Sequence, residues 1–263
     1  KCLPGVYAVA TADDIPGLKT TGRFRSDWPI MVGAGDEVRF SGDVVAIAAA
    51  ETENIARKAL SLIKVDYEHL EPVLSVNQAL SPEAPLIHKE GNVYAVTEIH
   101  RGKNEIARSN TIHEVSNTYE FPPAEHGFLE TEAAVAIPLG ERMIVRSADQ
   151  GIFLTQRQIA LTLNCDKEQI LVEGYPVGGA FGGREDILVQ GHAALLSKLT
   201  NKPVFLQYSR TDSLKIHPKR HPMKIRVSSG CDEKGNLTYL DMDLVADKGA
   251  YASLGLPVLE RAC

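Results

Sequence analysis

The sequence lacks the cysteine spacing that a zinc ribbon or an iron–sulfur centre requires. Its four cysteines are Cys2, Cys165, Cys231 and Cys263, and no two of them form a Cys-x-x-Cys pair. This spacing excludes both kinds of centre within the chain. We interpret all four as ordinary thiols of a reducing cytoplasm.

A positive charge excess and long apolar runs are also missing. The formal net charge is −6 and the pI is about 5.8, so the composition offers no electrostatic footprint for a nucleic acid. No apolar stretch reaches the ~18 residues of a membrane-spanning helix, and no basic-then-apolar leader opens the sequence. We therefore expect a cytoplasmic protein with neither a nucleic-acid partner nor a membrane partner.

The two ends of the sequence are atypical of natural termini, which are usually polar and loose. The chain opens on KCLP without a methionine. It stops within LERAC, where apolar and charged residues alternate as though a structural element were under way. We therefore expect a fragment of a longer protein.

The pattern along the chain predicts an α+β fold with two units. In residues 1–115, an apolar run at 44–49 predicts a buried strand, and Thr52 can cap the helix that follows it. Residues 65–68 predict a short strand, and the Pro-, Ser- and Gly-rich stretch 80–92 predicts a surface connection.

The second unit is expected over residues 116–263. Hydrophobic periodicity predicts two helices, at about 152–163 and 185–199, and Leu188 would face inward on the second. Alternating patterns predict four strands, at 133–138, 143–148, 170–175 and 204–209. A hairpin is predicted after them, with strands at 223–229 and 237–246.

The most informative stretch is a glycine-rich loop at 178–185, which has the sequence GGAFGGRE. It follows a predicted strand and opens a predicted helix. Its glycines let the backbone approach a ligand closely, and amides at a helix start can bind an electronegative atom. Glu185 and Asp186 would lie where the helix dipole favours negative charge.

Three interpretations of this loop compete on residue chemistry alone. A dinucleotide-binding fingerprint fits poorly, because Ala180 occupies its second glycine position. A phosphate-binding Walker A loop fails, because Arg184 and Glu185 stand where Lys and Ser or Thr are needed. A tight turn without a ligand remains, but a large aromatic such as Phe181 is better suited to packing against a flat ligand.

The loop closely resembles the GGGFGGKE segment of the xanthine dehydrogenase and aldehyde oxidase family, a segment that lies beside the molybdenum of a molybdopterin cofactor. Ala180 and Arg184 are its two departures from that segment. Residues 147–150, SADQ, are similar to the family's STQ segment at the same distance before the loop Phe. Further similarity lies at 125–132 (EHGFLETE), 220–222 (RHP), and, for the family's α/β hammerhead domain, 38–46 and 65–67.

The resemblance implies roles for individual residues. Family members hydroxylate an electron-poor carbon with oxygen from water. Gln150 would then hydrogen-bond an oxygen ligand of the metal, and Phe181 and Gly182 would lie against the cofactor. Glu185 would contact a purine or related N-heterocycle, whereas aldehyde-oxidising relatives often carry an apolar residue there. The competing interpretations are a helix cap or solvated side chain for Gln150, and a choice set by the helix dipole for Glu185.

The resemblance also implies a domain plan, with an α/β hammerhead domain at 1–115 and the N-terminal part of a molybdopterin-binding domain at 116–263. The family's catalytic base and substrate-binding Arg would lie beyond Cys263, so no catalytic residue or direct metal ligand is expected in this chain. The chain alone would hold no molybdenum and show no turnover. Iron–sulfur clusters and FAD would lie on other domains or subunits, and the full-length form would be a homodimer.

Three histidines offer a further candidate metal site. His126, His217 and His221 lack the spacing of a helical zinc site, and Pro218 and Pro222 break helicity there, so we interpret the histidines as structural. Three other functions stay open for the chain: a non-catalytic assembly or binding module, an aldehyde-oxidising relative, and a nucleotide-binding domain.

Overall fold

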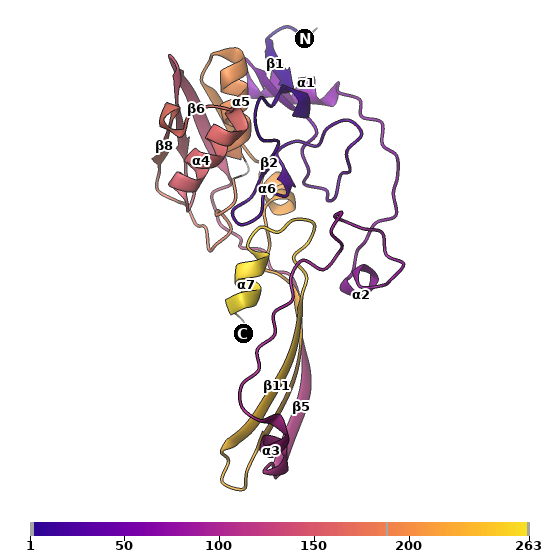
Figure 1. Ribbon diagram of the computed structural model, residues 1–263. Coiled ribbons are helices and arrows are strands. Elements are labelled where there is room, and N and C mark those ends of the chain that lie inside the picture. Colours follow the sequence, from indigo (N-terminus) through magenta and orange to yellow (C-terminus); the bar gives the residue numbers. More distant parts are fainter. Residues whose placement is uncertain (1–2, 188, 262–263) are drawn as a thin grey trace. The chain divides into compact units, whose positions relative to one another are not determined.

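The computed structural model describes residues 3–187 and 189–261, so Cys2, Leu188 and Cys263 lie outside the described residues. Helices and strands are mixed along the chain, and this confirms the α+β class (Figure 1). Among the described residues, no helix is long and apolar enough to cross a membrane.

The chain forms two compact units and enters each of them twice. The first unit comprises Lys1–Glu71 and Glu125–Pro218, and the second comprises Pro72–Ala124 and Lys219–Cys263. Segments far apart in the sequence therefore build each unit together. The predicted domain division at residue 115 stays a prediction, since a compact unit and a family domain need not share boundaries.

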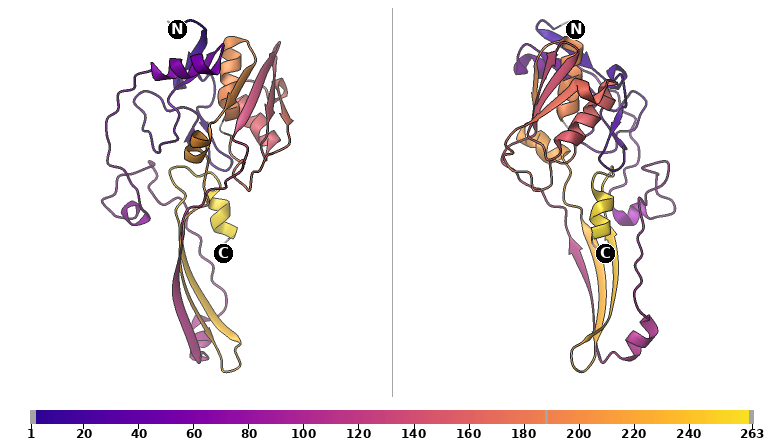
Figure 2. Two further views of the ribbon diagram at one scale, coloured as in Figure 1. Left: turned by 180° about the vertical axis from the view of Figure 1, so that it is seen from behind. Right: turned by 60° about the vertical axis from the view of Figure 1, so that its left-hand side comes forward.

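A four-stranded sheet organises the first unit, with the strand order β8-β7-β6-β9. Strand β6 (Ala133–Leu139) pairs antiparallel with both β7 (Arg142–Ser147) and β9 (Val204–Gln207). Strand β8 (Ile170–Gly174) pairs parallel with β7, and helix α4 (Ile152–Leu163) makes the crossover between them (Figure 2). All four strands predicted here, and the helix at 152–163, are confirmed.

Helix α5 (Val189–Thr200) passes through the core of the first unit. Leu195 and Leu196 are buried on it, and so is His192, whose ring Nε2 donates to the Ile30 carbonyl at 2.7 Å. Burial lowers the pKa of His192, so the ring is neutral. Burial extends from Val189 to Ser197 and includes the polar Gln190, so this part of the helix is enclosed by the rest of the unit.

The start of this helix corrects one prediction. Described α5 begins at Val189, and Glu185 and Asp186 lie in a bend before it rather than in its first turn. The loop holds its own conformation up to Arg184, because Gly183 N donates to Ala180 O at 2.8 Å and Arg184 pairs with Gln150. The helix dipole therefore does not explain Glu185.

The N-terminal segment of the first unit contributes a second sheet of two strands. Strand β1 (Val6–Ala10) pairs antiparallel with β4 (Ile47–Ala50). Thr52 caps α1 (Glu53–Ser61) as predicted, its hydroxyl accepting from Ile55 N at 3.4 Å. Two very short strands, β2 (Thr20–Thr21) and β3 (Trp28–Pro29), pair with each other.

The strand predicted at 65–68 is wrong. Those residues have no regular structure, and the apolar side chains Val65 and Tyr67 are exposed. A strand-like alternation stabilises a strand only where neighbouring strands pack against it, and none does so here in the described chain.

The second unit is built on a three-stranded antiparallel sheet with the order β11-β10-β5. Strand β5 (His113–Phe121) pairs with β10 (Met223–Cys231), which forms the predicted hairpin with β11 (Leu237–Ala246). The remaining helices are short: α2 (Val76–Ala79), α3 (Asn104–Ser109) and α7 (Gly255–Arg261) in this unit, and α6 (Arg210–Ile216) in the first.

Candidate cofactor and substrate site

The glycine-rich loop connects β8 to α5, and its backbone is held in an unusual conformation. Gly179 and Gly182 have φ values of +97° and +86°, which glycine tolerates easily. Phe181 has a φ of +52°, which costs a side-chain-bearing residue about 1–3 kcal/mol. Its side chain is nonetheless 73% exposed, so burial of the ring does not offset this strain.

The glycines of the loop serve two different purposes. A Cβ at Gly178 would lie 2.6 Å from Glu130 Cβ, and one at Gly183 would lie 3.0 Å from His126 Cγ, so both allow close packing. A Cβ at Gly182 would meet nothing within 4 Å. Gly182 therefore presents a bare backbone edge to open space, which a ligand could approach.

An ion pair between the buried Arg184 and the partly exposed Glu130 fixes the loop at both of its ends. Glu130 Oε2 accepts from Gly178 N at 2.8 Å and from Arg184 Nη1 at 3.0 Å. Arg184 is only 4% exposed; it also donates to Ala148 O at 3.0 Å and lies 4.6 Å over the Phe128 ring. A planar guanidinium suits this combination of several acceptors and one aromatic face.

Gln150 contacts the loop directly through its backbone and its side chain. Gln150 N donates to Arg184 O at 3.0 Å, and Arg184 N donates to Gln150 Oε1 at 3.3 Å. The amide oxygen of this exposed side chain is thereby engaged, which leaves its –NH₂ end to donate to a ligand.

A helix-capping role for Gln150 finds no support in the geometry of α4. The N-cap residue is Gly151, and Asp149 provides the side-chain contacts there. Its carboxylate accepts from Gly151 N at 2.9 Å and from the Thr155 hydroxyl at 3.1 Å. Asp149 therefore secures the start of the helix, and Gln150 is left to contact the loop.

Glu185 forms an ion pair with Arg23, and both side chains are half-buried. Arg23 comes from the N-terminal segment of the same unit, and its guanidinium lies 5.8 Å from the Phe24 ring. The ion pair holds the carboxylate of Glu185 beside the loop. No local pattern in the sequence points to Arg23, because 162 positions separate the two partners.

The residues gathered here fit a group that carries oxygen ligands and a flat face. Gln150 offers an amide donor, Gly182 a bare backbone, and Phe181 an exposed ring. These three residues carry no thiolate, imidazole or carboxylate that could bind a metal directly. The arrangement is thus suited to holding a molybdenum–molybdopterin group by its ligands rather than by its metal.

Two family models match the chain and together account for most of it. Residues 87–263 match the molybdopterin cofactor-binding domain, and residues 1–71 match the a/b hammerhead domain of aldehyde oxidase and xanthine dehydrogenase. The glycine-rich loop and Gln150 lie in the first match, and Arg23 lies in the second.

Similar proteins are found among both sequences and structures. The chain is 39% identical to a probable xanthine dehydrogenase subunit of Bacillus subtilis, over 98% of this chain and 34% of that protein. It is 33% identical to the nicotinate dehydrogenase large molybdopterin subunit of Eubacterium barkeri, over 100% of this chain and 61% of that one.

Among solved structures, aldehyde oxidoreductase from Desulfovibrio gigas matches with a TM-score of 0.92 at 25% identity, over 98% of this chain and 30% of that chain. Quinoline 2-oxidoreductase from Pseudomonas putida 86 matches with a TM-score of 0.83 at 25% identity, over 95% of this chain and 33% of that chain. The chain thus spans between about a third and three fifths of the length of these relatives.

Proposed function

The chain belongs to the aldehyde oxidase and xanthine dehydrogenase family, and from that premise we propose that it forms one wall of a molybdenum hydroxylase active site. The observation that carries the proposal is the pairing of Gln150 with Arg184. This pairing brings an amide donor to the end of the glycine-rich loop, where Gly182 and Phe181 are open to a ligand.

The chain's own residues bind and orient the cofactor in this proposal. The –NH₂ of Gln150 donates to an oxygen ligand, and the Gly182 backbone allows the group to approach closely. Phe181 packs against it, and the energy of that contact offsets the strain of its backbone. The bound cofactor supplies the two-electron chemistry that places an oxygen atom from water on carbon.

The substrate that we propose is a purine or a related N-heterocycle. Glu185 provides a carboxylate that can accept a hydrogen bond from a ring N–H. Relatives named for xanthine, nicotinate and quinoline act on N-heteroaromatic rings by their names, which supports this assignment. The similarity to aldehyde oxidoreductase supports an aldehyde as the second candidate.

The two electrons released by hydroxylation must pass to redox centres outside this chain, because its cysteines do not have the spacing of an iron–sulfur cluster. Hydroxylation with water releases two electrons, and no two cysteines of this sequence have the Cys-x-x-Cys spacing of a cluster. We therefore place iron–sulfur clusters and FAD on other domains or subunits of the enzyme. The homodimeric state of that enzyme remains part of the same proposal.

The source of the oxygen atom tests the proposed reaction. The holoenzyme is incubated with hypoxanthine in water enriched in heavy oxygen, and the product is analysed by mass spectrometry. We expect the label to enter the hydroxylated carbon at the enrichment of the water. A product whose new oxygen comes from dioxygen would overturn the proposal, and so would turnover by an enzyme that contains no molybdenum.

A further inference from the structure

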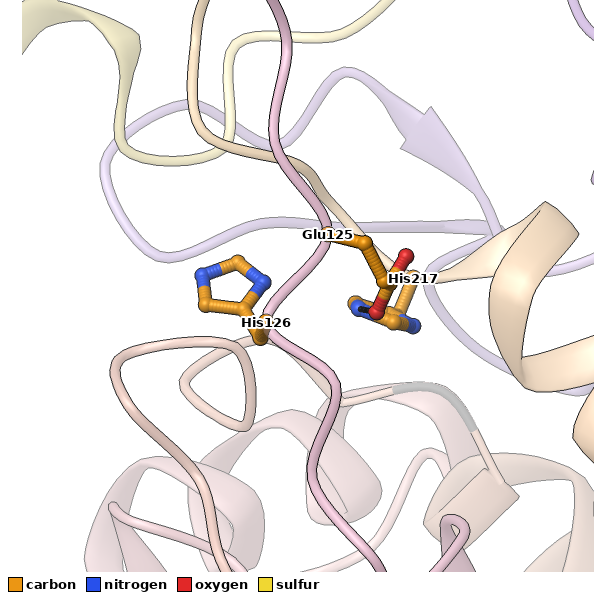
Figure 3. Close-up of side chains that lie close together, drawn as sticks. All are labelled: Glu125, His126 and His217. Atoms are coloured by element: carbon orange, nitrogen blue, oxygen red, sulfur yellow. Dashed lines mark ion pairs between the residues drawn. The ribbon is translucent and has the colours of Figure 1, made fainter.

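Glu125, His126 and His217 form a cluster of metal-ligating side chains outside the glycine-rich loop. Each residue offers one ligand atom, and these atoms all lie within 4.8 Å of one another. Glu125 and His126 are neighbours in the segment before β6, whereas His217 follows the end of α6 (Figure 3). The sequence predicts structural histidines here, because their spacing is not that of a helical zinc site.

The end of helix α6 fixes the orientation of His217. Ser209 and Asp212 form a capping box at the start of the helix, and the helix ends where His217 Nδ1 lies 2.5 Å from the Ser213 carbonyl oxygen. Because a carbonyl oxygen only accepts, Nδ1 must carry the proton. Histidines that bind metals are usually held by such a hydrogen bond from the second ring nitrogen.

The other nitrogen of His217 faces a carboxylate. Nε2 lies 2.8 Å from Glu125 Oε1, which also accepts from Gly127 N at 3.3 Å. Two ligands of one tetrahedral zinc ion lie about 3.3 Å apart, given bonds of ~2.0–2.1 Å. The two side chains therefore need to separate by only about half an ångström to hold an ion between them.

Negative charge accumulates around the buried imidazole. Glu132 is 7% exposed in its side chain, and its Oε1 lies 3.4 Å from His217 Nδ1. Among the described residues, neither of its carboxylate oxygens has a hydrogen-bond partner. Glu125 and Glu132 thus place two carboxylates around one ring, and the buried carboxylate of Glu132 is costly unless a positive charge balances it. A divalent cation would balance both.

We propose that Glu125, His126 and His217 bind one divalent transition-metal ion of the Zn²⁺ type. Two imidazoles and one carboxylate are ligands that zinc accepts readily, whereas Ca²⁺ and Mg²⁺ prefer oxygen ligands. Glu132 supplies negative charge on the Nδ1 side of His217, and the Ser213 carbonyl accepts a hydrogen bond that orients the ring.

The ion would stabilise the surface on which the glycine-rich loop packs. His126 lies against Gly183, and the Phe128 ring lies 4.8 Å from the His217 ring and 4.6 Å from the Arg184 guanidinium. Fixing residues 125–128 to the end of α6 therefore fixes the surface on which the loop packs. The site is structural, and it does not depend on the proposed hydroxylase reaction.

Metal titration tests the proposal. The full chain is stripped with a chelator and titrated with ZnCl₂ by calorimetry, and with CoCl₂ by visible absorption. We expect one equivalent of either ion to bind, with the absorption of a four- or five-coordinate Co²⁺ site. His126→Gln and His217→Gln should each weaken binding by more than about tenfold. The control is His100→Gln, since His100 is exposed and 3.8 Å from Glu98, and it should bind as the unchanged protein does.

His217 is buried, so His217→Gln can destabilise the fold. His126 is only half-buried, and we expect His126→Gln to fold and to report on metal binding by itself. Circular dichroism establishes which variants are folded. Absence of stoichiometric binding in the unchanged protein would overturn the proposal. Binding that persists equally in folded His126→Gln would also overturn it.

Discussion

At the scale of single residues, Arg184 connects several parts of the candidate site. Its side chain joins Glu130, the Ala148 carbonyl and the Phe128 ring, while its backbone pairs with Gln150. A lysine, which the related family segment carries at this position, offers a point charge and no planar face. The arginine is therefore well adapted to this buried position, where several acceptors must be satisfied at once.

Arg184→Lys should lower the free energy of unfolding by about 1–3 kcal/mol, because the buried side chain at this position loses hydrogen bonds to Glu130 and to the Ala148 carbonyl. The measurement is urea denaturation followed by circular dichroism. Arg146→Lys is the matched control, since Arg146 pairs with Glu173 at 2.7 Å but is half-exposed; its change should stay within about 0.5 kcal/mol. Equal effects of the two substitutions would show that burial of Arg184 has no energetic importance.

Glu185→Val in the holoenzyme should reduce kcat/KM for a purine by about tenfold or more, because a substrate hydrogen bond of about 1.4 kcal/mol or more is lost. Turnover of an aromatic aldehyde should fall much less. Glu173→Val, which also removes an arginine-paired carboxylate, should leave both substrates unaffected. Parallel losses for purine and aldehyde would contradict the role of Glu185 in substrate recognition.

At the scale of elements, hydrophobic periodicity predicted those helices and strands that bury one regular face. It predicted helix α4 and the strands β6, β7, β8 and β9 within a few residues. It failed at 65–68, where alternation occurs without burial, and at the start of α5, where the loop's tertiary contacts determine the backbone. Local patterns do not contain that information.

The candidate site shows the same division. The loop and Gln150 were predicted because they are similar to short segments of a known family. Sequence patterns did not reveal the ion pairs of Arg23 with Glu185 and of Glu130 with Arg184. The partners of each pair lie far apart in the sequence. The cluster of His126 and His217 was missed for the same reason, since only the fold brings the two rings together.

The hairpin between β10 and β11 supports a prediction about pH. Asp232 lies in the turn of this hairpin. Hydrogen bonds to the Asp232 carboxylate, chiefly from the Asn236 side chain, hold the pKa of Asp232 below its ordinary value. A lowered folded-state pKa contributes stability that is present above the unfolded-state pKa and is lost as the pH falls through the folded-state pKa. Asp232→Ala should therefore destabilise the protein at neutral pH, and the difference should shrink under acid conditions.

Thermal unfolding at a series of pH values measures this effect. The control is Glu233→Ala, which removes a neighbouring carboxylate of the same turn and is measured at the same pH values. A destabilisation by Asp232→Ala that is constant from neutral to acid pH would contradict the assignment.

At the scale of the whole molecule, the first unit joins parts of the chain that two different family models match. Arg23 lies in the hammerhead match and Glu185 in the molybdopterin-binding match, yet they form one ion pair. The proposed substrate contact is therefore positioned by both domains. A site assembled in this way depends on the packing of the whole unit rather than on the loop alone.

The most direct test of the account compares two glycine substitutions in the holoenzyme. Gly182 and Gly235 have φ values of +86° and +80°, and a Cβ at either meets nothing within 4 Å. Alanine at either position should therefore cost a similar amount of stability, about 1 kcal/mol. We predict that Gly182→Ala removes most of the molybdenum content and turnover, whereas Gly235→Ala preserves both. Retention of molybdenum and turnover in Gly182→Ala, at the level of Gly235→Ala, would contradict the proposal that this loop faces the cofactor.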